Sequence, residues 1–411
     1  MNKHLFFRIF TLWFLLTQTC PPFNLIMPFI GVSQVALYVL LAIMYFPSLL
    51  NKKTIISLIL FACVNFLFYF KGNEFYQGLN TVIVPFLIML SGLLIAEYAF
   101  KYDKDYIFTK SVIITVIAAN VFMAVISIPQ LIVAPNIIRG AELNNSTSED
   151  MRMVYGWIMS YSTVHGIPIL IAPLTFLCIH LRRRGCRYIK WLVITFLFLF
   201  VVFRSNATTA FLLSVIMLIG GIFLNTEKFD KKLLVRFTIL ISLLLVFGQP
   251  EVIVSGLDVA QETMDKRGSN HKKIDELEDE LMYGDSDGDW NKRVVLYETS
   301  STLFKQSPLF GTPTPEMISH HTWIVDRLAL FGLVFSIPMF MLFFYYFKQM
   351  YSNLYHTKVI FVLGFVGLLF MLYMKNEFGQ GTWLYGFAFL PLMCRYIDYR
   401  FKRTDSNIII I

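Results

Sequence analysis

Long apolar stretches separated by short polar segments follow one another along the whole of this chain. Most of them approach the ~20 residues that an α-helix needs to cross the ~30 Å hydrocarbon layer of a bilayer. The pattern therefore predicts an all-α integral membrane protein with about twelve transmembrane helices. The predicted spans are residues 5–22, 29–49, 54–70, 80–99, 108–133, 155–180, 188–204, 206–224, 232–248, 321–347, 357–374 and 381–396.

Composition points the same way. Of the 411 residues, 56% are hydrophobic and 15% are charged, and the mean hydropathy is +0.63. A soluble domain could not bury so much apolar surface. Arg8 interrupts the first apolar stretch and no small-residue cleavage site follows, so we expect a retained first helix rather than a signal peptide. The five cysteines show no C-x-x-C spacing, and we interpret them as small apolar residues.

The net charge of +8 is concentrated in short basic segments between the apolar stretches. These segments all fall on one side of the predicted spans, and positively charged loops are typical of the cytoplasmic side. We therefore expect both termini to be cytoplasmic and expect no nucleic acid as a partner. The basic segments are residues 51–53, 101–106, 181–190, 225–232 and 395–403.

This topology divides the chain into three parts. Residues 1–248 form about nine N-terminal transmembrane helices, and residues 249–320 form one large hydrophilic loop on the external face. Residues 321–411 form the C-terminal transmembrane helices and a short basic cytoplasmic tail. Because function concentrates in loops held by a rigid scaffold, a single large external loop suggests work on a substrate presented at the outer membrane surface.

Arg293 is the first candidate site residue. In the segment 291–308, Val294, Tyr297 and Phe304 have the spacing of one side of an amphipathic helix, which places Arg293 in its first turn. A guanidinium group matches phosphate oxygens, so Arg293 is a candidate anion clamp. The alternative is an exposed arginine on a loop helix.

Two adjacent histidines, His320 and His321, precede the tenth apolar stretch. With Ser319 or His320 as the cap, His321 would lie in the first turn of a helix and share a face with Leu328 and Gly332. The partial positive charge of a helix N-terminus favours the neutral imidazole, which can act as a general base near pH 7. The alternative is a pair of polar residues at the membrane interface.

Three more charged residues lie where charge is costly. Asp326 and Arg327 lie about one turn inside the tenth stretch, where ionisable groups usually face a polar cavity or each other. Arg204 lies beside Ser205 and Asn206 in a tight external turn, where it would either snorkel or bind phosphate.

His165, Lys375 and Glu377 lie near external helix ends and could line the same cleft. Walker, dinucleotide-binding, HExxH and GxSxG motifs are absent, so we expect no cofactor and no metal.

The segments "NKRVVLYETSSTLFKQSPLFG" and "HHTWIVDRLALFG" together resemble the signature region of the O-antigen ligase and O-antigen polymerase superfamily of bacterial inner membranes. Val325 and Thr322 stand where the family has a leucine and an asparagine, and the family arginine of the external turn corresponds to Asn206, two residues after Arg204. The matching positions are Arg293, Pro308 to Gly311, His321, Leu328 and Gly332.

The resemblance implies a metal-independent glycosyltransferase that acts at the periplasmic face. Its donor would be an oligosaccharide linked to undecaprenyl pyrophosphate, and its acceptor another glycan. Arg293, with Arg204 as second candidate, would stabilise the departing pyrophosphate, and Arg327 is a further substrate-binding candidate. His321 would orient or deprotonate the acceptor hydroxyl, with His320 as the alternative base.

Within this family the two outcomes are a polymerase, whose acceptor is another lipid-linked repeat unit, and a ligase, whose acceptor is lipid A-core. The segment from Gly311 to His321 is short and leaves little loop to recognise a large second acceptor, which favours the polymerase. A polysaccharide transporter or flippase is the rival from a different class. Membrane lipids, a chain-length regulator and a flippase are the further partners expected of a polymerase.

Overall fold

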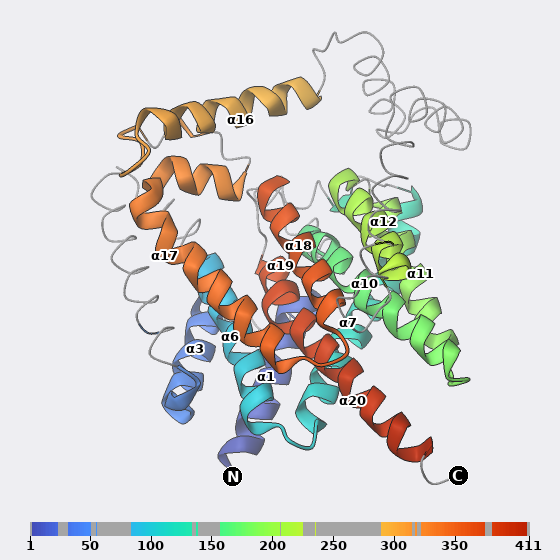
Figure 1. The fold of residues 1–411 in the computed structure, drawn as a ribbon. Coiled ribbons are helices and arrows are strands. Elements are labelled where there is room, and N and C mark those ends of the chain that lie inside the picture. The colour runs from blue at the N-terminus through green and yellow to red at the C-terminus, as the bar shows by residue number, and fades with distance from the viewer. Residues whose placement is uncertain are drawn as a thin grey trace. The chain divides into compact units, whose positions relative to one another are not determined.

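The computed structural model describes residues 2–23, 32–50, 55, 84–133, 137–138, 157–205, 207–224, 235, 289–314, 317–318, 322–374 and 380–408. Within these ranges every regular element is a helix (Figure 1). The chain divides into a larger unit, residues 1–227, 334–372 and 378–411, and a smaller unit, residues 228–333 and 373–377. The all-α prediction is thereby confirmed for the described part of the chain.

Most of the predicted spans overlap a described helix. Apart from residues 55 and 235, spans 54–70 and 232–248 fall outside the described residues, and each of the other spans overlaps a described helix. The elements are α1 (Lys3–Thr19), α3 (Val32–Tyr45), η1 (Pro47–Leu49), α6 (Val84–Tyr102), α7 (Ile107–Val133), α10 (Tyr161–Arg183), α11 (Ile189–Arg204), α12 (Thr208–Phe223), α16 (Asp289–Gln306), α17 (Trp323–Asn353), α18 (Lys358–Met374), α19 (Gln380–Leu384), η4 (Tyr385–Phe389) and α20 (Leu390–Ile408).

Two of the described helices, α7 and α10, are long and apolar enough to cross a membrane. Three shorter apolar helical stretches accompany them, over Gln34–Tyr45, Thr209–Phe223 and Lys358–Tyr373. Such helices suggest a membrane protein. The number of spans and the cytoplasmic position of the termini stay predictions.

The core of the larger unit is built around α10. This helix packs against α11 and α12, and its residue Gly166 lies under the ring of Tyr385. A Cβ atom at Gly166 would lie only 2.3 Å from Cδ2 of that ring, so a larger residue would displace it. The Tyr385 hydroxyl donates to Oδ1 of Asn120 on α7 at 2.5 Å, and Tyr385 begins the π-helical turn η4. The hydrogen bond joins η4 to α7, and the packing of the same ring on Gly166 adds α10.

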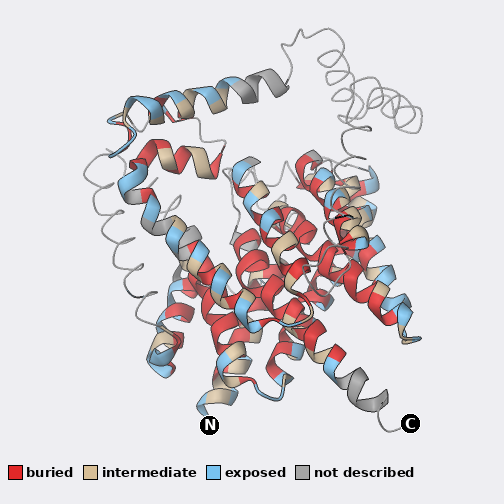
Figure 2. Ribbon diagram, in the orientation of Figure 1, coloured by how far each residue is buried: buried red, intermediate tan, exposed pale blue. Residues whose placement is uncertain are grey.

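The exposed faces of the same helices are also apolar. Figure 2 shows buried residues toward the interior of the larger unit and exposed ones on its outer surface. On α11 the exposed side chains recur at helical spacing while Phe198 and Val201 are buried. In water such a face would be polar, so this pattern is typical of helices that face lipid. The exposed residues of this stripe are Ile189, Val193, Phe196 and Phe200.

Candidate functional site

The candidate site begins with a buried carboxylate between two helices of the smaller unit. Asp326, in the first turn of α17, is 1% exposed and accepts a hydrogen bond from the Ser300 hydroxyl of α16 at 2.6 Å. It also accepts from the backbone N–H of Thr322 at 3.0 Å. The two helices lie side by side in Figure 1. Asp326 therefore caps the start of α17 and joins it to α16.

The start of α17 differs from the prediction. Thr322 is non-helical and the helix begins at Trp323, later than a cap at Ser319 or His320 would place it. The reason lies in Asp326, which binds the N–H of Thr322 while its own N–H donates to the Thr322 carbonyl at 3.0 Å. This reciprocal pairing satisfies a free donor at the helix start and fixes the boundary there.

The two sequence segments that carry the family resemblance, one ending at Gly311 and one containing Gly332, meet where their main chains cross. Thr312 donates its N–H to the Ala329 carbonyl at 2.7 Å, and Leu333 donates to the Pro308 carbonyl at 2.8 Å. Between these bonds lie Gly311 and Gly332, both with positive φ angles, of 77° and 66°. The turn after α16 is thereby held against the middle of α17.

Both glycines are required at this crossing. A Cβ atom at Gly311 would lie 2.1 Å from the Leu330 carbonyl oxygen, and one at Gly332 would lie 2.4 Å from the Leu309 carbonyl carbon. Side chains at either position would collide with backbone, which cannot move aside as a flexible side chain could. The motif glycines therefore have a structural explanation in the close approach of two main chains.

Gly332 also interrupts α17, because its φ of 66° and ψ of −176° are not helical. The prediction of one continuous span over residues 321–347 is corrected here. The helix consists of a first segment, Trp323 to Phe331, and a second segment that starts at Leu333. The spacing from His321 through Leu328 to Gly332, predicted as one helix face, therefore ends at a break.

Arg293 lies on α16, as predicted, although the helix begins at Asp289 rather than Asn291. Arg293 precedes Tyr297 by four residues and Ser300 by seven, so the three positions share one face of the helix. On that face Tyr297 stacks on Tyr373, with ring centroids 5.6 Å apart. Tyr297 and Ser300 thus mark the face by which α16 packs within the smaller unit.

Arg327 and Arg204 both contact groups of the protein itself. Arg327 is 7% exposed, and its guanidinium carbon lies 5.9 Å from the centre of the Trp323 ring. Arg204, in the larger unit, donates from Nη2 to the carbonyls of Leu131 and Ile132, at 3.3 and 3.1 Å. These carbonyls belong to the last turn of α7, so Arg204 caps that helix. Snorkelling and phosphate binding were the only roles that its sequence position suggested.

Five of the residues singled out in the sequence lie outside the part of the chain that the structure describes. His320 and His321, Asn206, and the pair Lys375 and Glu377 lie outside the described residues. His165 is described and buried, at 5% exposed, with Nδ1 2.9 Å from the Tyr161 carbonyl. Its interior position does not favour a role in lining an open cleft.

Sequence reasoning missed Ser300 altogether and left Asp326 without a role. A serine on a loop helix carries no signal in the sequence. Its role in joining α16 to α17 follows only from the hydrogen bond between the two helices. Within the described ranges, no group of three or more His, Cys, Asp or Glu side chains could hold a metal ion. Comparisons of the chain with protein-family models, curated proteins and solved structures find no match.

Proposed function

We propose that this chain is a glycosyltransferase that polymerises oligosaccharide repeat units linked to undecaprenyl pyrophosphate at the periplasmic face of the bacterial inner membrane. The observation that supports this most directly is the meeting of the two parts of the motif. The Gly311–Gly332 crossing and the Ser300–Asp326 hydrogen bond hold α16, with Arg293, beside the start of α17, which follows His321 in the chain.

The proposed reaction needs one cation and one base. An acceptor sugar hydroxyl attacks the anomeric carbon of the donor glycan, and a new glycosidic C–O bond forms as the bond to pyrophosphate breaks. The leaving group is already anionic, so charge stabilisation by Arg293 serves it better than protonation. His321 takes the proton of the acceptor hydroxyl, with His320 as the alternative base.

The membrane supplies the surroundings that a lipid-linked donor needs. The two long apolar helices and the exposed apolar stripe of α11 both favour a lipid environment. In this proposal the chain crosses the inner membrane about twelve times with both termini inside. The polyprenyl tail of the donor stays in lipid while its pyrophosphate reaches the smaller unit.

The test is complementation of a deletion strain with variants at equal membrane abundance. Arg293→Ala and His321→Ala are each expected to lower glycan elongation by about 10²-fold or more, because one charge-stabilising group or one general base contributes that much. Surface glycans are resolved on gels. Lys305→Ala, an exposed position on the same helix α16, is the matched control and should retain full elongation.

The same gels, together with extraction of lipid-linked glycans from each side of the membrane, separate the alternatives. A single repeat unit on lipid A-core in the deletion strain indicates a polymerase, whereas bare core with accumulated lipid-linked polymer indicates a ligase. Accumulation of undelivered lipid-linked single units on the cytoplasmic side indicates a flippase. Normal polymer length in either Arg293→Ala or His321→Ala would exclude the proposed mechanism.

A further inference from the structure

The turn between α16 and α17 ends in two exposed apolar side chains. Leu309 is 55% exposed and Phe310 is 58% exposed, although both belong to a tight turn closed by the N–H of Gly311 on the Ser307 carbonyl at 3.0 Å. Turn tips in water are usually polar, since glycine, proline, asparagine, aspartate and serine favour them. A leucine and a phenylalanine side by side at such a tip indicate an apolar environment.

The position of this tip is fixed with respect to α17. The Pro308 carbonyl accepts from the N–H of Leu333, and Gly332 lies against the backbone of Leu309. Leu333 is the first residue of the second segment of α17. Leu309 and Phe310 are therefore held beside Leu333, which is itself 39% exposed, and cannot move away from it without breaking the glycine crossing.

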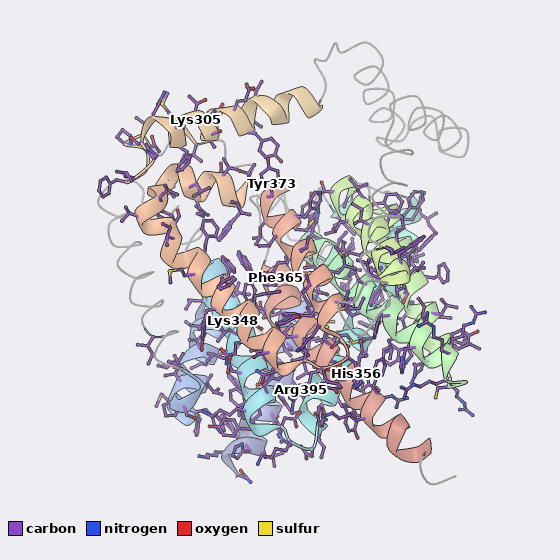
Figure 3. All side chains as sticks on the ribbon, in the orientation of Figure 1. Lys305, Lys348, His356, Phe365, Tyr373 and Arg395 are labelled. Carbon is purple, nitrogen blue, oxygen red and sulfur yellow. The ribbon has the colours of Figure 1, made fainter. Side chains whose placement is uncertain are left out.

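The second segment of α17, which belongs to the larger unit after Leu333, has an exposed apolar stripe of its own. The exposed residues recur every three or four positions, which places them on one face of the helix. A polar boundary lies on the other side of the tip, because Lys305 and Gln306 at the end of α16 are exposed (Figure 3 labels Lys305). The stripe consists of Leu333, Val334, Ile337, Met341 and Phe344.

We propose that Leu309 and Phe310 insert into the outer leaflet of the membrane, so that the partner of this surface is the lipid bilayer. Together with Leu333, the tip exposes three apolar side chains on one surface of the smaller unit, and hydrocarbon is the surrounding that such a surface favours. The inference rests on the proposed membrane location but not on the reaction, because it holds whichever glycan the protein transfers. Its consequence is that the smaller unit is anchored to lipid at the turn that joins the two parts of the motif.

Spin labels on the full-length chain in nanodiscs of zwitterionic and anionic phospholipid test the proposal. Leu309→Cys and Phe310→Cys are labelled one at a time in a background without native cysteines. Collisions with oxygen, which partitions into lipid, are compared with collisions with a water-soluble nickel chelate. Val295→Cys on α16 is the matched control, because Val295 is also 55% exposed, and Met341→Cys is the lipid reference.

Insertion predicts an oxygen-to-nickel ratio at positions 309 and 310 several-fold above that at 295 and close to that at 341. A ratio equal to that at 295, with 341 still in lipid, would overturn the inference and leave the membrane location intact. If the label at position 341 also collided mainly with the water-soluble nickel chelate, both the insertion of the tip and the proposed membrane location would fail. Shielding of 309 and 310 from both reagents would mean that a second copy or another protein covers the tip, which also overturns it.

Discussion

Asp326 is an acidic side chain in an apolar part of the chain, and the hydrogen bonds from Ser300 and Thr322 help to explain how it can be buried there. A buried carboxylate is costly unless donors satisfy it, and here a hydroxyl and a main-chain N–H do so. Each partner belongs to a different part of the smaller unit, Ser300 to α16 and Thr322 to the start of α17. One carboxylate therefore sets both the boundary of a helix and the place of its neighbour.

Asp326→Ala is expected to destabilise the protein by about 3 kcal/mol or more, because hydrogen bonds to a charged group contribute roughly 1.5–3 kcal/mol each and both donors would lose their acceptor. Ser300→Ala removes only one of these bonds and should cost about half as much. Thermal unfolding of the purified protein in nanodiscs measures both.

Thr299→Ala is the control for this pair of substitutions. Thr299 neighbours Ser300, but its hydroxyl donates to the Val295 carbonyl of its own helix, so a change within about 0.5 kcal/mol is expected. An Asp326→Ala protein that unfolds at the temperature of the Thr299→Ala protein would show that the carboxylate does not join the helices.

Sequence reasoning at this scale predicted that Asp326 must have a polar surrounding, because an unpaired charge in an apolar stretch is costly. The identity of the partner could not follow, since Ser300 is 26 residues away and its spacing signals nothing. The same limit applies to Arg204. Its charge marks it as unusual, but the α7 carbonyls that it caps lie more than 70 residues earlier in the chain.

At the scale of elements, the break in α17 is the feature that hydropathy cannot reveal. A glycine within an apolar run is compatible with a continuous helix, and Gly332 also fits the helical spacing from His321. Its positive φ follows from the approach of the Leu309 backbone, which is a tertiary contact. The approximate positions of the apolar helices, by contrast, follow from local apolar runs, and the predicted spans overlap a helix in most of the described chain, although bounds and breaks differ.

Gly332→Ala is expected to cost more than 2 kcal/mol, because its φ of 66° and ψ of −176° lie in a region essentially restricted to glycine, which costs an L side chain roughly 1–3 kcal/mol, and the new Cβ atom would also collide with Leu309. Chemical or thermal unfolding in nanodiscs measures the loss, and glycan elongation should fall with it because the parts of the motif would separate.

Gly185→Ala supplies the comparison. Gly185 has a φ of 65°, nearly the same as that of Gly332, but nothing lies within 4 Å of the Cβ that alanine would add. It should therefore show only the backbone penalty of roughly 1–2 kcal/mol. Equal losses in the two variants would argue against the crossing as a tight contact.

The π-helical turn η4 is a second element that the sequence pattern did not predict. The local run around Tyr385 reads as ordinary apolar helix, and the irregular turn places the Tyr385 hydroxyl on Asn120 of α7. Insertions of this kind are frequent at functional sites, but here the polar contact that accompanies it lies in the core of the larger unit.

At the scale of the whole molecule, the informative surface is that of α11, which is apolar both on its buried side and on its exposed side. A water-soluble bundle needs a polar outer face, and α11 has Ile189, Val193, Phe196 and Phe200 there instead. Composition alone predicted this environment, because 56% of the chain is hydrophobic. Composition could not predict which face of each helix meets lipid, since that depends on which neighbours bury the other face.

Phe196→Lys distinguishes a lipid-facing from a water-facing surface. Phe196 is 62% exposed near the middle of α11, and a lysine at the centre of a membrane helix costs about 2.5–3.5 kcal/mol. In water the same exposed change would stay within about 0.5 kcal/mol. The fraction of protein recovered in the membrane and its unfolding temperature should both fall.

The matched change is Ile189→Lys, at the first residue of α11 and 66% exposed. A lysine at a helix end can reach the headgroup region, so this variant should behave like the unmodified protein. Tolerance of lysine at both positions would mean that α11 faces water.

The hydrogen bond between Ser300 and Asp326 also bears on the order in which the chain folds. It closes a loop of 26 residues, whereas the bond between Asn120 and Tyr385 joins residues 265 apart. Contacts that are local in sequence form sooner and at a smaller entropic cost than distant ones. During synthesis the α16–α17 pairing can therefore form before the last helices emerge, and the core around Tyr385 closes afterwards. The part of the chain with the candidate site would then fold as an early module that does not wait for the C-terminus.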